Sequence, residues 1–151
     1  MGLRVVRHSF LFEPGHWQAR GTLFDAAGDG CALAGDLHVT HGADSWHNEA
    51  AISLEKETPF NLSGSYDVVP FSSRQGATSW RSLNPTLGEL EGHITVVGEV
   101  MISGFNSADH RYSGASYLRQ ISGDCYHNRG FLITNGALAS SWSMVLVRIR
   151  G

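Results

Sequence analysis

The feature that most constrains the fold is a run of four segments in which apolar and polar residues alternate, separated by short turn-forming stretches. We expect strands over residues 17–24, 31–41, 46–54 and 60–68. A period of two is typical of a strand whose two sides meet different surroundings. Gly, Asp, Ser and Pro, which occur between the segments, favour turn geometries. The run therefore predicts four consecutive antiparallel strands.

The pairing register follows from the turns, because facing residues of an antiparallel hairpin have a constant index sum. With the turns at the midpoints, one side of the sheet is almost wholly apolar or small: Trp17, Val39, Asn48 and Tyr66; Ala19, Leu37, Ala50 and Gly64; Gly21, Gly35, Ile52 and Leu62; Leu23, Leu33, Leu54 and Phe60. The other side pairs Arg20 with Asp36, His38 with Glu49 and His47 with Asp67. A slip of one residue places charges in the interior, so we expect the first side to face inward.

The remaining sequence continues the strand pattern. Further strands are predicted over residues 3–12, 77–83, 93–105, 111–121, 125–134 and 140–150, and Asn135-Gly136 is a strong hairpin signal. The inward glycines of the first half suit a sheet that coils tightly and closes on itself. The sequence therefore predicts an all-β protein, a single closed antiparallel up-and-down β-barrel of about nine to ten strands, with residues 1–151 as one domain.

The constant index sum of facing residues also predicts which side chains of the second half point inward. It directs these residues inward: Val96, Gly98, Val100, Ile102, Leu118, Gln120, Tyr126, Asn128 and Leu132. Glu99, Tyr117 and Arg129 then share the outer face, with Glu99 beside Arg129. The last hairpin has two possible registers. A three-residue turn directs Trp142, Met144, Leu146 and Arg148 inward, whereas a two-residue turn directs them outward.

Composition excludes several classes of partner. The chain has 151 residues, 42% of them hydrophobic and 17% charged, with 11 Lys and Arg against 14 Asp and Glu. No basic run is present, so we expect neither a nucleic-acid partner nor an anionic membrane surface. The sequence suggests no signal peptide and no membrane-inserted segment, and Cys31 and Cys125 lie in separate strands. We therefore expect a cytoplasmic protein whose two thiols are reduced.

Gly15, Trp17 and a late basic residue, Arg148 or Arg150 as its substitute, resemble a pattern of the calycin superfamily. That superfamily includes lipocalins, fatty-acid-binding proteins and nitrobindin-like haem proteins. The resemblance implies a barrel floor in which the tryptophan seals one end and the basic side chain packs across its ring. It also implies that a small apolar or amphipathic ligand binds inside the barrel. No late histidine stands where the haem ligand of nitrobindin-like proteins is expected, so we expect no cofactor.

Polar and aromatic residues that face the predicted interior are the candidate ligand-binding residues. They are Trp17, His41, Trp46, Asn48, Tyr66, Trp80, Tyr126 and Asn128, with apolar walls from Leu37, Ile52, Leu62, Val100 and Leu132. A polar group in an apolar interior costs roughly 1–3 kcal/mol if it has no partner. These groups therefore either line a cavity and bind a ligand or satisfy one another in an internal network.

Other functions are weighed on the same residues. His16 and His47 lie two strands apart, roughly 10 Å at about 4.8 Å per strand, so we expect surface pairs and no metal site. No catalytic residue can be assigned, but an isomerase, cyclase or lyase using Tyr66 or Tyr126 as an acid, with Asn48 stabilising an oxyanion, is an alternative. A third hypothesis is a filled barrel that forms a homo-oligomer through an outer patch of Val97, Met101, Tyr117 and Phe131.

Overall fold

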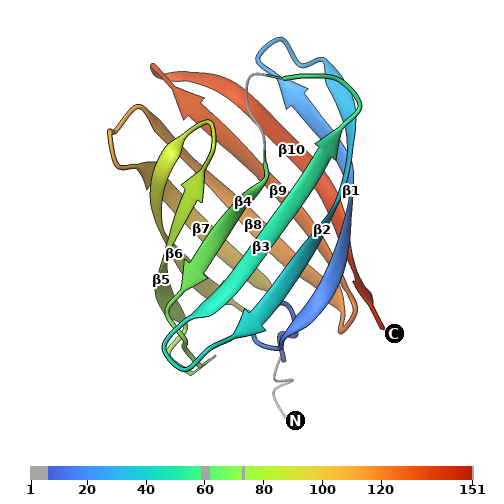
Figure 1. Ribbon diagram of the computed structural model, residues 1–151, viewed down its shortest axis with the longest axis vertical. Helices are drawn as coiled ribbons and strands as arrows, with labels where there is room; N and C mark the ends of the chain where they lie inside the picture. Colours follow the sequence, from blue (N-terminus) through green and yellow to red (C-terminus); the bar gives the residue numbers. More distant parts are fainter. Residues whose placement is uncertain (1–6, 59–61, 73, 151) are drawn as a thin grey trace.

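The computed structural model describes residues 7–58, 62–72 and 74–150, in which ten antiparallel strands form a closed barrel (Figure 1). The strands are β1 (Gly15–Asp25), β2 (Gly30–His41), β3 (Trp46–Leu54), β4 (Gly64–Val68), β5 (Ala77–Asn84), β6 (Gly88–Val97), β7 (Val100–Ser107), β8 (Tyr112–Ser122), β9 (Cys125–Thr134) and β10 (Ala137–Ile149). Each strand pairs with its neighbours in sequence, and β1 pairs with β10. The predicted closed up-and-down β-barrel is confirmed.

The barrel has two different ends. The β1–β2, β3–β4, β5–β6, β7–β8 and β9–β10 connections lie at one end, the upper end in Figure 1. The other four connections lie at the lower end, where the chain also enters and leaves the barrel (Figure 1). No helix long and apolar enough to span a membrane is found among the described residues.

Three of the predicted registers are confirmed. Val39 faces Asn48, Asn48 faces Tyr66, and Leu118 faces Asn128. Pairs of facing strands therefore bring Asn48 and Tyr66 to the same level of the interior, as the arithmetic predicts.

The register of the first hairpin differs from the prediction by two residues. Trp17 faces Leu37 and not Val39, and Arg20 faces Ala34 and not Asp36. The Asp25 carboxylate causes this shift, because it accepts hydrogen bonds from the backbone N–H groups of residues 27 and 29 and centres the turn one residue earlier. A shift of two leaves the same side chains inward.

The predicted long strand over residues 93–105 is wrong, because the chain turns back within it. Gly98 has φ +58°, a conformation that glycine adopts at little cost, and a tight turn joins β6 to β7 there. Val100 therefore faces Arg119, and Ile102 is 46% exposed. Met101 lies inside with only 2% of its surface exposed, so it is not part of an outer patch. Arg129 donates to the Tyr117 hydroxyl at 2.9 Å rather than pairing with Glu99.

The last hairpin combines a two-residue turn with inward side chains. Thr134 faces Ala137 across Asn135 and Gly136, both with positive φ. A β-bulge between Leu138 and Ser140 then shifts the register by one residue. The bulge restores the inward direction of Met144 and Leu146, which are 8% and 2% exposed.

Close strand packing explains two of the three inward glycines of the first half, whereas Gly64 has room for a Cβ atom. A Cβ atom on Gly21 would lie 2.0 Å from the Ser143 carbonyl oxygen, and one on Gly35 would lie 2.2 Å from the Ala51 carbonyl oxygen. Strand β4 begins at Gly64 and not at residue 60, and residues 59–61 lie outside the described residues. Cys31 and Cys125 are free thiols.

Candidate functional site

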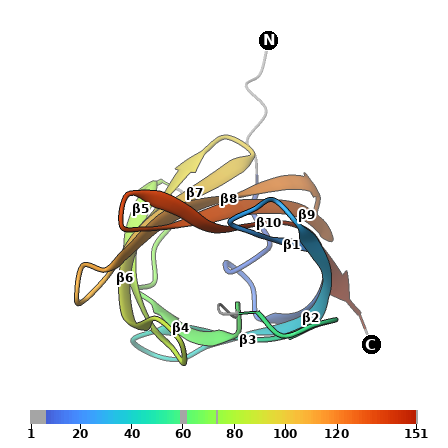
Figure 2. The same cartoon turned by 90° about the horizontal axis from the view of Figure 1, so that it is seen from above.

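The N-terminal segment fills the lower end of the barrel and forms its floor. Residues 7–14, named the plug here, make a turn closed by a hydrogen bond from the backbone N–H of Glu13 to the Ser9 carbonyl at 3.0 Å. Figure 2 shows this blue segment inside the ring of strands. The predicted strand over residues 3–12 is therefore wrong for its described part, and residues 1–6 lie outside the described residues.

The hydroxyl group of Tyr126 holds the plug from the barrel wall. Its oxygen accepts hydrogen bonds from the backbone N–H of Ser9 at 3.1 Å and of Phe10 at 3.4 Å. His8 Nε2 donates to the Gly98 carbonyl at 2.9 Å, so Nδ1 of a neutral ring accepts the Tyr126 proton at 2.8 Å. Tyr126 is 0% exposed, and burial raises the pKa of its phenol.

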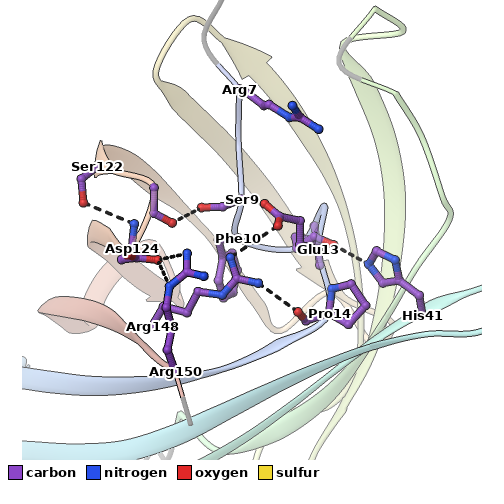
Figure 3. A network of polar contacts seen from close by, with 12 residues as sticks. Arg7, Ser9, Phe10, Glu13, Pro14, His41, Ser122, Asp124, Arg148 and Arg150 are labelled. Atoms are coloured by element: carbon purple, nitrogen blue, oxygen red, sulfur yellow. Dashed lines mark hydrogen bonds and ion pairs between the residues drawn. The ribbon is translucent and has the colours of Figure 1, made fainter.

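Further contacts tie the plug to several strands (Figure 3). His41 Nε2 donates to the Leu11 carbonyl at 2.8 Å, and Arg148 donates to the Pro14 carbonyl at 3.1 Å. The Ser9 hydroxyl donates to the Gly123 carbonyl at 2.6 Å. Leu11 has φ +73° and is 4% exposed, a backbone conformation that a leucine keeps only where its surroundings enforce it.

Trp17 packs against the plug and against Arg148. It is 0% exposed, and its ring meets the Phe10 ring edge-on at 5.4 Å. The guanidinium carbon of Arg148 lies 5.7 Å from the centre of a Trp17 ring, and a Cβ atom on Gly15 would lie 3.3 Å from Arg148. The alternative residue, Arg150, is on the surface and pairs with Asp124 at 2.6 Å.

A cavity of about 200 Å³ lies above the plug. Aromatic rings from Phe10, Tyr66, Trp80, Phe105 and Trp142 line it. Aliphatic and methionine side chains cover most of the remaining wall, and its polar members are Asn48, Asn84, Ser103, Ser116, Asn128 and Ser140. The described residues that line it include no Asp, Glu, Lys, Arg or His.

The structure divides the eight candidate ligand-binding residues into two groups. Asn48, Tyr66, Trp80 and Asn128 line the cavity. The other four, Trp17, His41, Trp46 and Tyr126, lie around the plug: Trp46 stacks on His41 with ring centres 4.5 Å apart and meets Phe12 edge-on at 5.5 Å. Of the predicted apolar walls, Leu37, Ile52, Leu62 and Leu132 line the cavity. Val100 does not, because the turn at Gly98 exchanges the two faces of β7.

Three aromatic rings lie over glycines of the neighbouring strand. Trp80 faces Gly92, Phe105 faces Gly114 and Trp142 faces Gly130. A Cβ atom on Gly92 or Gly130 would lie 2.2 Å from the facing indole ring, and one on Gly114 would lie 2.5 Å from the Phe105 ring. Each ring therefore occupies space at the wall that a side chain would take, which leaves the centre of the barrel open.

Most cavity polar groups have partners in the protein. Asn128 Nδ2 donates to the Tyr117 carbonyl at 2.8 Å, and its Oδ1 accepts from Trp142 Nε1 at 3.1 Å. Trp80 Nε1 donates to the Ser103 hydroxyl at 2.8 Å. These hydrogen bonds connect Asn128 to the Tyr117 carbonyl and to Trp142, and not to another of the candidate polar residues.

Asn48 and Tyr66 differ from this network. Asn48 Oδ1 is shielded from solvent and has no hydrogen-bond partner. Tyr66 is partly exposed toward the cavity, and burial raises the pKa of its phenol, while the neighbouring Ser82 hydroxyl opposes the rise. Trp17 Nε1 and Ser82 Oγ are two further shielded side-chain atoms of the described residues without a hydrogen-bond partner.

A second hollow, of about 530 Å³, lies at the upper end. Residues of the β1–β2 turn, the β3–β4 connection and the β9–β10 hairpin line it, and Ser140 belongs to both hollows. The cavity therefore adjoins a hollow at the end opposite the plug.

Two outer histidines, His16 and His47, form pairs with carboxylates. His16 Nε2 lies 2.6 Å from Asp36, and His47 lies 2.9 Å from Asp67 and 2.7 Å from Glu49. Hydrogen bonds to Asp67 and then to Glu49 raise the pKa of His47. No group of three or more His, Cys, Asp and Glu side chains suited to a metal ion occurs in the described part of the chain.

Comparison with known proteins supports the barrel and confirms no family. Neither a family model nor a curated protein matches the sequence. The solved structure of the S-type phycobiliprotein lyase CPES from Guillardia theta is similar, with a TM-score of 0.69 and 10% identity over 93% of this chain and 90% of that chain. A redesigned β-barrel, mFAP1, bound to DFHBI has a TM-score of 0.48 and 12% identity over 95% of this chain and 100% of that chain. At these identities the likeness to the lyase concerns the fold.

Sequence reasoning missed several wall residues for identifiable reasons. Phe10 and Leu11 lie within the predicted strand over residues 3–12, although Glu13-Pro14-Gly15 after them signals a turn. The predicted direction of the β7 side chains is reversed. Ser103 and Phe105 are therefore expected to face outward, although they line the cavity. Gly98-Glu99, between two segments of alternating residues, is the signal that could have identified the turn.

Proposed function

We propose that this protein binds a small hydrophobic or amphipathic molecule inside the barrel. The cavity of about 200 Å³ with its aromatic and aliphatic wall carries the proposal. Small-molecule sites are typically concave and mostly apolar, with a few polar groups that orient the ligand. A cavity of about 200 Å³ suits a small molecule.

The calycin-like interpretation belongs to the same proposal. The arrangement of Gly15, Trp17 and Arg148 and the barrel fold shared with a phycobiliprotein lyase support it. In this interpretation residues 1–151 form one domain, the plug closes its lower end, and the ligand enters from the upper end. Asn48, Tyr66, Trp80 and Asn128 are the proposed ligand contacts, because they come from four strands and face one cavity.

The enzyme alternative has less support. A tyrosine that acts as an acid near neutral pH needs a lowered pKa. Burial instead raises the pKa of both Tyr66 and Tyr126 above 10.0, and the Tyr126 hydroxyl is occupied by the plug. Binding is therefore the function that we propose.

The proposal is tested by titrating the protein with the neutral fluorescent probe N-phenyl-1-naphthylamine. We expect saturable binding at one site. Ala50→Leu adds bulk to the cavity wall and should weaken binding about tenfold, which corresponds to about 1.4 kcal/mol. Ala51→Leu is the matched control, because Ala51 is exposed on the outside of the same strand. Absence of saturable binding, or equal weakening by both variants, contradicts the proposal.

A further inference from the structure

The outer surface of the barrel is divided between two kinds of wall. Strands β8, β9 and β10 contain no Asp or Glu, and β1 contains one, Asp25, at its last residue. Strands β2–β6 instead contain five carboxylates and a single Lys or Arg side chain: Asp36, Glu49, Asp67, Glu89 and Glu91, with Arg81. Figure 2 shows β8, β9 and β10 on the side opposite β3 and β4. Charge is therefore distributed unevenly around the barrel.

The outward side chains of β8, β9, β10 and β1 form one continuous surface, named the arginine face here. One row across these four strands consists of Arg119, His127, Val145 and Arg20, which face one another in register. At about 4.8 Å per strand, the two arginines lie roughly 14 Å apart. Arg129 lies outward in the next row, two residues along β9 from His127. The face therefore spreads its positive charge over three strands.

The protein leaves these positive charges without acidic partners. Arg20 and Arg119 are exposed, and neither forms an ion pair with a described residue. Asp36, on the neighbouring strand β2, pairs instead with His16 at 2.6 Å. Arg129 donates to two neutral hydroxyl groups, at 2.9 and 3.3 Å. All three guanidinium groups are therefore available to an anionic partner.

Large apolar side chains are concentrated on and beside the arginine face. Of the ten large hydrophobic side chains exposed among the described residues, six lie on β7–β10 and are 38–49% exposed: Ile102, Ile121, Phe131, Val145, Val147 and Ile149. Val145 lies between His127 and Arg20 in the central row. Exposed apolar surface of this kind is typical of an interaction site.

An anionic bilayer surface matches both properties of this face. Its phosphate groups attract arginine side chains, and the layer directly beneath them receives apolar side chains. A soluble acidic protein would neutralise the arginines but would place Val145 and Val147 against hydrated carboxylates. The outward side of a closed barrel is also convex, so a rigid partner contacts little of it, whereas a fluid lipid surface conforms to it.

We propose that the arginine face docks on an anionic phospholipid surface, with Arg20, Arg119 and Arg129 at the phosphates and Val145 and Val147 in the layer beneath. The acidic strands β3–β6 then point away from the lipid, which orients the molecule despite its net charge of −3. No basic run in the sequence indicates this surface, because its arginines come from β1, β8 and β9. The docking is independent of what the cavity binds and is opposite to the expectation from the sequence.

Vesicle flotation with the unaltered protein tests the docking. Vesicles of phosphatidylcholine and phosphatidylglycerol in equal amounts should bind the protein, and added sodium chloride should weaken the binding because it screens the attraction. Vesicles of phosphatidylcholine alone should bind at least about tenfold more weakly, since each arginine near an anionic surface contributes a factor of about five. Poly-L-glutamate serves as a soluble polyanion without an apolar layer.

Arginine variants locate the charged contact. Arg20→Gln and Arg119→Gln each remove one charge from an exposed position, and each should weaken binding to the mixed vesicles about fivefold. Arg81→Gln is the matched control, because Arg81 is exposed on β5 and should change the affinity by less than about twofold. Circular dichroism verifies that each variant keeps the barrel.

A valine variant tests the apolar contact. Val145→Thr exchanges one methyl group for a hydroxyl group and keeps the branched shape, so it should weaken binding to the mixed vesicles about fourfold, the equivalent of one buried CH₂ group. Val69→Thr is the matched control, because Val69 is 54% exposed directly after β4, and its affinity should equal that of the unaltered protein.

The outcomes decide between a lipid surface and a soluble acidic partner. Salt-sensitive binding to the mixed vesicles, weakened by Arg20→Gln, Arg119→Gln and Val145→Thr, supports the docking. Absence of vesicle binding, equal affinity for both kinds of vesicle, or an equal loss with Arg81→Gln overturns it. Equal losses with Val145→Thr and Val69→Thr overturn the apolar contact. Binding to poly-L-glutamate but not to the mixed vesicles indicates an acidic protein and overturns the lipid assignment.

Discussion

Replacing Tyr126 by phenylalanine removes one buried oxygen atom and tests how the plug is held. The ring remains and keeps its packing against Trp17, whose ring centre is 5.6 Å away. The backbone N–H of Ser9 loses its acceptor, which costs roughly 1–3 kcal/mol for a buried group, and the His8 bond contributes roughly 0.5–1.5 kcal/mol. The long Phe10 contact of 3.4 Å adds little. We expect the free energy of unfolding to fall by about 1.5–4.5 kcal/mol.

Urea denaturation measures this loss, and amide hydrogen exchange at Ser9 locates it. If the plug detaches before the barrel unfolds, the opening free energy measured at the Ser9 amide falls by more than the global free energy of unfolding. Tyr117→Phe is the matched control, because its hydroxyl accepts from Arg129 at the surface and its loss should cost less than about 0.5 kcal/mol. Equal stability of the two variants, with Ser9 protection unchanged, refutes the role given to the Tyr126 hydroxyl.

Two further predictions concern the cavity wall. A Cβ atom at Gly130 would lie 2.2 Å from the Trp142 ring. Gly130→Ala should therefore displace the ring and destabilise the protein by about 1–3 kcal/mol. An unchanged melting temperature would contradict the packing of Trp142 over Gly130. The pKa of Tyr66 is raised above 10.0, so its folded form favours the neutral phenol. The stability linked to Tyr66 is therefore complete below pH 10 and is lost as pH rises through the folded-state pKa, and Tyr66→Phe should reduce the alkaline loss of stability in urea titrations. An unchanged alkaline profile, or absorbance showing that Tyr66 ionises at or below pH 10, counts against this assignment.

The sequence predicts most of the barrel because its alternation is strict where one face is buried. The pairing of Asn48 with Tyr66 follows from alternation and turn position alone. Two features escape such reasoning because a single residue controls them. Gly98 reverses the chain inside an apparently continuous alternation, and the bulge before Ser140 changes the face of β10 without any strong sequence signal.

The candidate site is predictable only in part. Asn48 and Asn128 have the same residue type and the same predicted direction, yet only Asn128 has partners for both of its polar atoms. That difference depends on the position of Trp142, which the sequence leaves open between two registers. Alternation and turn positions cannot predict the plug, because its contacts with Tyr126 join residues more than 110 positions apart.

The floor made by residues 7–14 gives this barrel a modular internal design. The depth of the chamber depends on the side chains of Phe10 and Leu11, which belong to no strand, whereas its width depends on the strands around it. Substitutions at these two positions can lengthen or shorten the chamber without changing a single pairing of the sheet. The depth and the width of the chamber are therefore set by different parts of the chain.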